Sequence, residues 1–142
     1  MKTAVIAAFL ALLCSASSAW AAGGAPEPTA AAPLDPVIEK TQAAIAKQDW
    51  KAAQDSVREG LAKRPDYPDY HNLYAYSIRM GANPAMDLVF KHYNEALRLD
   101  SKHRRAHEYL GEAYLMVGNL AKAKDHLKVL DEIGRASCRE RV

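Results

Sequence analysis

Apolar residues recur at helical spacing in six segments of the chain, and short polar or Gly- and Pro-containing breaks separate them. Residues three or four positions apart lie on one face of a helix, so each segment predicts an amphipathic helix. The expected helices run over about 36–47, 50–63, 69–80, 84–99 and 102–117, and a sixth begins near 120. The pattern predicts an all-α fold of antiparallel helical hairpins, stacked on one another.

Residues that favour helix ends support these boundaries. Asp49 is expected to cap the second helix through its side chain. Asn83 is expected to cap the fourth helix, with Pro84 in the first helical position, where proline is favoured. Gly81 and Gly118 should end the third and fifth helices.

The hairpins repeat. Val89 is followed by Ala123, and Tyr93 by Leu127, at the same interval, which is typical of helical repeat arrays. The interval from Leu73 to Leu110 is three positions longer, which predicts three extra residues in the middle unit, placed at 81–85. Small residues should let helices approach closely while large ones fill the space between units. The residues expected to define the repeat are Ala53, Leu61, Pro65, Leu73, Gly81, Tyr93, Ala96, Leu110, Gly111, Tyr114, Gly118, Ala123 and Leu127.

Over about 36–131 the sequence resembles the tetratricopeptide-repeat family, whose period of about 34 residues equals the interval from Tyr93 to Leu127. Leu110 and Gly111 match the large–small pair of the family, whereas Tyr74 stands where its glycine is expected and Ser101 where its proline is expected. The resemblance implies a short α-solenoid of about three hairpins, such as small exported bacterial proteins of this family form.

The resemblance also implies a non-catalytic scaffold that binds a protein or peptide partner in a concave groove lined by the first helix of each hairpin. The corresponding groove positions are Gln42, His71, Arg79, Arg105, Glu108 and Glu112. Their mixed charge and the absence of a Lys–Asn pair argue against capture of a terminal carboxylate. Four tyrosines cluster around the second unit and are expected mainly in the core between repeats: Tyr67, Tyr70, Tyr74 and Tyr76.

Motifs for catalysis or cofactor binding are absent from the sequence, so we expect no enzyme activity and no cofactor. His103 and His107 are four positions apart and share a helix face, which leaves a metal-binding or enzyme-accessory role as the alternative. Such a site would need Glu108 or His71 as a third ligand. Packing of both histidines is the favoured interpretation.

The segment 1–21 has the pattern of a cleaved signal peptide. Lys2 precedes an apolar run over 4–13, and Ala19-Trp20-Ala21 forms a cleavage site. The alternatives are a lipoprotein anchored through Cys14, disfavoured by the two leucines before it, and an uncleaved anchor. The segment 22–35 should form a flexible Ala- and Pro-rich linker. We therefore expect export, residence in the periplasm of a Gram-negative bacterium, and no stable membrane anchor after cleavage.

The segment 132–142 lacks apolar periodicity, and the sixth helix is expected to end near Asp131. The segment resembles an in-frame translation of a sequencing adapter, which predicts a non-native tail and a truncated last helix. A genuine basic tail is the alternative. The last hairpin would then lack the polar element that normally covers the end of a repeat array, which leaves assembly into a homo-oligomer open.

The charge of the chain resides at its ends. The whole sequence has 19 basic and 17 acidic residues, a net charge of +2. Without Lys2 and the segment 135–142, the range 22–134 has 15 basic and 16 acidic residues, so a basic surface for nucleic acid is not expected. Cys14 and Cys138 both lie outside this range, which therefore cannot form a disulfide.

Overall fold

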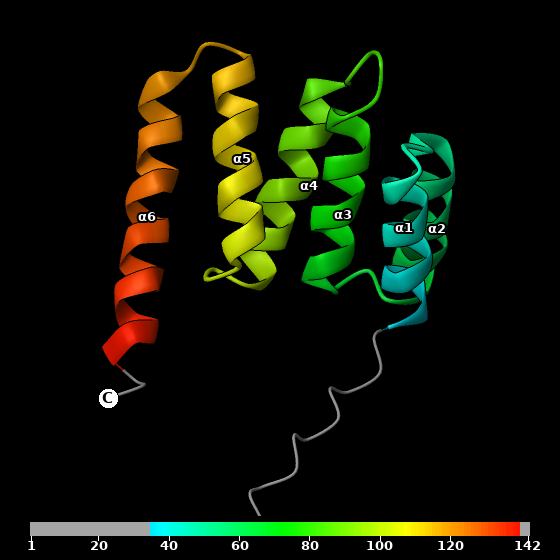
Figure 1. Cartoon of the computed structure of the whole chain (residues 1–142), viewed down its shortest axis with the longest axis horizontal. Helices are drawn as coiled ribbons and strands as arrows, with labels where there is room; N and C mark the ends of the chain where they lie inside the picture. The colour runs from blue at the N-terminus through cyan, green and yellow to red at the C-terminus, as the bar shows by residue number, and fades with distance from the viewer. Residues whose placement is uncertain (1–34, 140–142) are drawn as a thin grey trace, which may run out of the picture. The chain divides into compact units, whose positions relative to one another are not determined.

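The computed structural model describes residues 35–139, which form six α-helices and, within that range, no strand (Figure 1). The signal peptide, the linker up to residue 34 and the segment 140–142 lie outside the described range. Among the described helices, none is long and apolar enough to cross a membrane. The helices are α1 (Pro36–Ala46), α2 (Trp50–Lys63), α3 (Pro68–Arg79), α4 (Met86–Leu99), α5 (Arg104–Met116) and α6 (Leu120–Arg139).

The helices pack as three antiparallel hairpins, α1–α2, α3–α4 and α5–α6, stacked in chain order (Figure 1). The first helices of successive hairpins also contact each other, α1 with α3 and α3 with α5. They therefore form one layer, which we call the inner layer, and the second helices α2, α4 and α6 lie behind it. The expectation of an all-α fold of stacked hairpins is confirmed.

Side-chain caps mark the starts of several helices. The Asp49 carboxylate accepts the Ala52 N–H at 3.0 Å, as expected from the sequence. The Asn119 side chain accepts the Lys122 N–H at 3.1 Å in the same way at the start of α6. Gly118, just before Asn119, has a φ of 75°, a conformation that glycine adopts without strain. These caps satisfy backbone donors that the first turn of a helix leaves unpaired.

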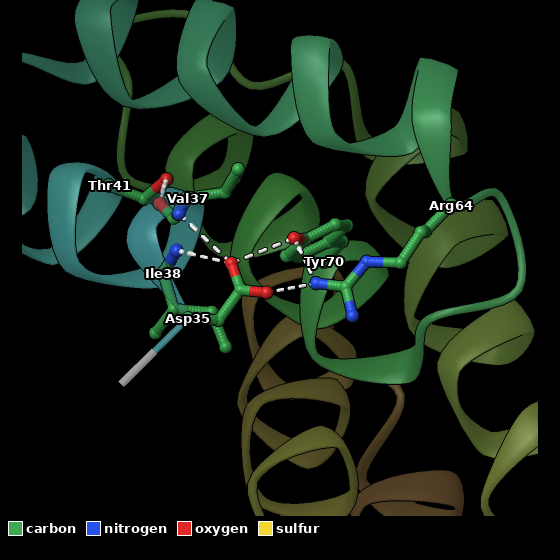
Figure 2. A network of polar contacts seen from close by, with 6 residues as sticks. All are labelled: Asp35, Val37, Ile38, Thr41, Arg64 and Tyr70. Carbon is green, nitrogen blue, oxygen red and sulfur yellow. Dashed lines mark hydrogen bonds and ion pairs between the residues drawn. The ribbon is translucent and has the colours of Figure 1, made fainter. Parts of the chain in front are cut away.

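Asp35 caps α1 and also joins it to its neighbours (Figure 2). Its carboxylate accepts the Val37 N–H at 2.9 Å and the Tyr70 hydroxyl at 2.8 Å, and pairs with Arg64, which contacts the same hydroxyl. Burial opposes ionisation of Asp35, but the bonds from Tyr70 and the backbone lower its pKa overall. One side chain thus links α1 to the end of α2 and to α3.

Two expected helix boundaries are wrong. The fourth helix begins at Met86 with Ala85 as its cap, so neither Asn83 as cap nor Pro84 in the first position is observed. Met86 is the first apolar residue there that packs on the core, and the helix begins with it. The sixth helix continues past Asp131 to Arg139, supported by an exposed Asp131–Arg135 ion pair of 2.7 Å one turn apart. The origin of this last segment stays a prediction.

Two buried clusters hold the stack together. The first packs α3 on the α1–α2 hairpin through Ile38, Val57, Tyr70 and Leu73. The second packs α5 on the α3–α4 hairpin, and its members are Ala75, Ile78, Val89, Tyr93, Leu110 and Ala113. Each cluster lies between a hairpin and the first helix of the next one, so neighbouring hairpins depend on each other for apolar burial.

The repeat register differs by one position from the expected pairing of Leu73 with Leu110. His71 and His107 occupy equivalent positions, because each contacts a histidine of the second helix of its hairpin. The interval between them is one position shorter than that from Leu73 to Leu110. The small residue that matches Gly111 is therefore the buried Ala75, not Tyr74. Since α4 and α6 keep the regular interval of the repeat, the middle unit contains two extra residues instead of three. Matching identical residue types misaligned the units, because caps and buried contacts determine the structural register.

Gly60 is a close contact between helices. A Cβ atom placed there would lie 2.8 Å from both Tyr70 Cε2 and Val37 Cγ1. We expect Gly60→Ala to lower the free energy of unfolding by about 1–3 kcal/mol, because the clash exceeds the gain in helix propensity. The control is Gly111→Ala, whose nearest contact would be an ordinary 3.5 Å to His126 Cβ. Urea unfolding checks both, and equal stabilities would contradict this packing.

Candidate partner-binding site

The inner layer contains a pocket between α1, α3 and α5. It has a volume of about 230 Å³ and is lined by Gln42, Ile45, Asn72, Leu73, Tyr76, Arg105 and Tyr109. Two of the six groove residues expected from the sequence, Gln42 and Arg105, thus meet in one site. The rings of Tyr76 and Tyr109 lie 4.8 Å apart between centroids and form an aromatic wall. We call this cavity the inner pocket.

Asn72 is the most unusual group in the inner pocket. It is 1% exposed, and its Oδ1 atom has no hydrogen-bond partner among the described residues. A buried acceptor without a donor destabilises a fold by about 1–3 kcal/mol. Asn72 lines the inner pocket, and its unpaired Oδ1 atom is itself buried.

Arg79 contacts the aromatic wall of the inner pocket and is not a free cation. Its guanidinium forms a 2.6 Å ion pair with Glu112 and donates to the Tyr93 hydroxyl at 3.4 Å. It also lies over the rings of Tyr76 and Tyr109, 5.6 and 5.7 Å from their centroids. Burial opposes its charge, but Tyr93 and Glu112 raise its pKa overall. Arg79 therefore orients the aromatic wall.

His71 is buried between the two helices of its hairpin. Its Nε2 lies 2.7 Å from the Pro65 carbonyl and its Nδ1 lies 2.8 Å from Nδ1 of His92. Since a carbonyl only accepts, we assign the proton of His71 to Nε2, and His92 then donates from Nδ1. His71 is therefore not part of the groove surface.

The third hairpin repeats this arrangement. His107 places Nε2 3.1 Å from the Ser101 carbonyl and Nδ1 2.9 Å from Nδ1 of His126. Burial and the charge of His71 lower the pKa of His92 to about 4, and burial and His107 lower that of His126. The lowered pKa values favour the neutral form of His92 and of His126.

His103 and His107 point to different partners. The Nδ1 atom of His103 accepts the Ala106 N–H at 3.1 Å and its Nε2 lies 3.1 Å from Asp69 Oδ1. Within residues 35–139 no group of three or more His, Cys, Asp or Glu side chains could hold a metal ion. The geometry therefore favours helix capping and packing for these two histidines.

Glu108 and Glu112 lie on a second surface. Together with Gly111 and Leu115 of α5 and Leu120, Leu127 and Leu130 of α6, they line a cavity of about 390 Å³. Leu127 was expected to fill space between units, but it is 65% exposed because none of the described helices packs against it. We call this surface the open groove.

Sequence reasoning did not select Asn72, Tyr76 and Tyr109 for the groove. Tyr76 was assigned to the core, whereas both tyrosines are in fact half-buried with one side in the pocket. Asn72 was not selected from the sequence. The expected alignment of the units was wrong by one position, so it did not pair Asn72 with Glu108, its equivalent in the third unit. A register taken from His71 and His107 would have paired it with Glu108.

Comparison with known structures supports the fold. No protein-family model matches the chain, and no curated protein does. Solved structures similar to it include "MamA RS-1 ArsTM double mutant" and "MamA MSR-1 C2", with TM-scores of 0.64 and 0.61 and 16% identity each. Each alignment covers 71% of this chain but only 56% and 57% of the other, so the chain spans little more than half their length. The chain therefore has the fold of a tetratricopeptide-type helical solenoid.

Proposed function

We propose that this protein is a non-catalytic interaction scaffold that binds an extended segment of a partner polypeptide in the inner pocket. The unpartnered Oδ1 atom of Asn72 carries the proposal. An extended peptide presents backbone N–H groups that no internal bond uses, and one of them would satisfy this acceptor once the Asn72 side chain, buried in the free chain, turns towards the pocket. The MamA-like fold supports a scaffold role, because repeats of this kind form long binding surfaces.

The other groups of the pocket add selectivity. Arg105 is exposed at its rim and can pair with an acidic side chain or a carbonyl of the segment. Tyr76 and Tyr109 offer a rigid aromatic surface, which is favoured at interfaces. The preferred ligand is therefore an internal peptide segment with an acidic residue near an apolar one.

Replacement of Asn72 by leucine tests this function. Removing a buried, unpartnered acceptor should raise the melting temperature, whereas peptide binding should weaken at least tenfold. Peptides are first selected from a random display library on the wild-type chain, and their affinities for the variant are then measured by fluorescence anisotropy. Lys91→Ala, on an exposed position of α4, is the control and should bind like wild type. Failure to enrich any peptide, or equal affinity for the leucine variant, would contradict the proposal.

We propose further that the scaffold acts outside the cytoplasm, in the periplasm. The signal-peptide pattern of the segment 1–21 supports this location. Mass spectrometry of the protein from a periplasmic fraction should show a mature chain beginning at Ala22. A chain that keeps Met1 and stays in the cytoplasmic fraction would contradict export.

A further inference from the structure

Four of the five histidines of the chain form two similar pairs, one in the second hairpin and one in the third. The Nδ1 atoms of His71 and His92 lie 2.8 Å apart, and those of His107 and His126 lie 2.9 Å apart. The first histidine of each pair is buried and the second is half-buried. Ring nitrogens from the two helices of a hairpin therefore face each other at two places in the chain.

The first hairpin shows that the fold does not require such a pair. Its register follows from the equivalent caps Asp49 and Asn119. In this register Val37 and Ser56 occupy the positions of the two histidines. The hairpin α1–α2 packs with these residues, although the buried Ser56 hydroxyl has no hydrogen-bond partner within residues 35–139. The imidazole pairs are thus a feature of the second and third hairpins that helix packing alone does not demand.

A backbone carbonyl orients the buried histidine of each pair. The Pro65 carbonyl lies 2.7 Å from Nε2 of His71. The Ser101 carbonyl lies 3.1 Å from Nε2 of His107. Since a carbonyl only accepts, Nε2 carries the proton, and the lone pair of Nδ1 points towards the partner ring. Histidines that bind metal ions in proteins are typically oriented in this way, by a hydrogen bond from the other ring nitrogen.

The second histidine of each pair can also offer a lone pair. A neutral imidazole carries its proton on either of its ring nitrogens. With the proton of His92 on Nδ1, the pair is joined by a hydrogen bond. With the proton on Nε2, both Nδ1 atoms present lone pairs to the space between them, and the same holds for His126. This change of tautomer involves no net loss of a proton.

We infer that each histidine pair is a binding site for one copper(I) ion, held between the two Nδ1 atoms. Imidazole nitrogen is a good ligand for copper, and copper(I) is stable with only two ligands in a near-linear arrangement. Zinc sites instead need three or four protein ligands. In the part of the chain that the structure describes, neither pair belongs to a group of three or more His, Cys, Asp or Glu side chains.

The charges around the pairs favour a monovalent ion. Both imidazoles of a pair are neutral ligands, so they do not compensate the charge of the ion. One lysine and one acidic residue act on the half-buried histidine of each pair, Lys91 and Glu95 in the second hairpin and Lys122 and Asp125 in the third. Because these charges oppose each other, one positive charge is less costly here than the two of a divalent ion.

A small movement of the rings makes room for the ion. Two metal–nitrogen bonds of about 2 Å in line place the Nδ1 atoms about 4 Å apart, so the observed pairs must separate by about 1 Å. His92 and His126 are half-buried and can turn outwards, while their partners stay bound to the carbonyls.

This assignment pairs His107 with His126, whereas the metal-binding alternative from the sequence joined it to His103. Both pairs are separate from the inner pocket, so the inference does not rest on the function proposed above.

Anaerobic titration with copper(I) tests the inference, with the chromophoric chelator bicinchoninate as competitor. All proteins are the full chain with Cys14→Ser and Cys138→Ser, because a thiolate such as that of the exposed Cys138 binds copper(I) itself. This cysteine-free chain should bind two ions. His92→Asn and His126→Asn should each reduce the number to one, and the double variant should bind none.

Matched controls separate loss of a ligand from loss of the fold. Asparagine keeps an N–H donor for the contacts to His71 and His107, so circular dichroism of the variants should match that of the parent. His103→Asn removes the histidine outside the pairs, and asparagine is a good helix cap in its place. This control should still bind two ions.

The ligands themselves provide the last reading. X-ray absorption of the copper-loaded chain should show two nitrogen ligands per copper and no sulfur. Sulfur ligands would assign the copper to methionines, such as the exposed Met80 and Met116, and would overturn the inference. No copper binding by the cysteine-free chain, two ions in the double variant, or equal binding of zinc(II) would overturn it as well.

Discussion

Replacing Tyr93 by alanine should lower the free energy of unfolding by about 3–5 kcal/mol, whereas Leu127→Ala should change it by less than about 1 kcal/mol. The two residues occupy equivalent positions of successive repeats. Tyr93 is fully buried beneath α5, and its hydroxyl accepts from Arg79. Leu127 is mostly in solvent. The difference between the variants therefore measures the contribution of the covering helix.

Urea unfolding followed by circular dichroism measures both variants. A loss of free energy of this size can unfold a small domain completely. Tyr93→Leu, which leaves a smaller cavity, therefore provides a second variant for the measurement. Tyr93→Phe keeps the ring and loses only the 3.4 Å contact with Arg79, so its effect should be the smallest at this position. Equal destabilisation by Tyr93→Ala and Leu127→Ala would show that the last hairpin is covered in solution.

Lowering the pH from 7 to 5 should destabilise the protein by about 1–2 kcal/mol through His92 and His126, after allowance for solvent screening. The pKa of His92 is lowered from 6.5 to about 4 by burial and by the charges of His71 and Lys91, with Glu95 acting in the opposite direction. Since His92 keeps its ordinary pKa in the unfolded chain, the unfolded chain binds more protons than the folded chain in this range. The free energy of unfolding therefore decreases as the pH is lowered. His126 adds to the effect in the same direction, because burial lowers its pKa as well.

The size of the acid effect follows from the pKa of His92. One pKa unit corresponds to about 1.4 kcal/mol, and partial exposure of the ring reduces the full value. Stability contributed by His92 is complete above about pH 6.5 and is lost as the pH falls towards about 4. The charges of His107 and Lys122 also lower the pKa of His126, and the charge of Asp125 acts in the opposite direction. Carboxylates with lowered pKa values, such as Asp69, add their own losses below this window.

A matched variant isolates the histidine contribution. In His92→Asn/His126→Asn an amide N–H can replace each Nδ1 donor without titrating, so the contacts to His71 and His107 are retained. The variant should keep most of its stability at pH 7 and lose much less than wild type between pH 7 and 5. A pH dependence identical to that of wild type would exclude the pairs as its source.

The helices were predictable because local signals and tertiary packing agree over most of the domain. The Asp49 cap, the α2 range and the Gly118 turn are found where the sequence places them. At Asn83 and Pro84 the local signal was strong, but packing of Met86 determined where α4 begins. The length of α6 beyond Asp131 had no apolar period to predict it, since those residues are exposed or only half-buried.

The candidate sites were less predictable than the fold. Gln42 and Arg105 were assigned to the groove from their repeat positions, and the structure brings them together. The partners of His71 could not be foreseen, because its contact with His92 depends on how closely α3 and α4 approach each other. The empty acceptor of Asn72 is a property of the packed interior, where the neighbours of each atom are determined by the tertiary structure.

The most direct test of the scaffold function is photo-crosslinking from the inner pocket in living cells. Benzoylphenylalanine replaces Tyr109 in the full chain and, in a control, the exposed Lys91 of α4. A binding scaffold should give a discrete crosslinked polypeptide from Tyr109 and none from Lys91, and Asn72→Leu should abolish the adduct. No adduct from Tyr109, or an equal yield from Lys91, would contradict the account.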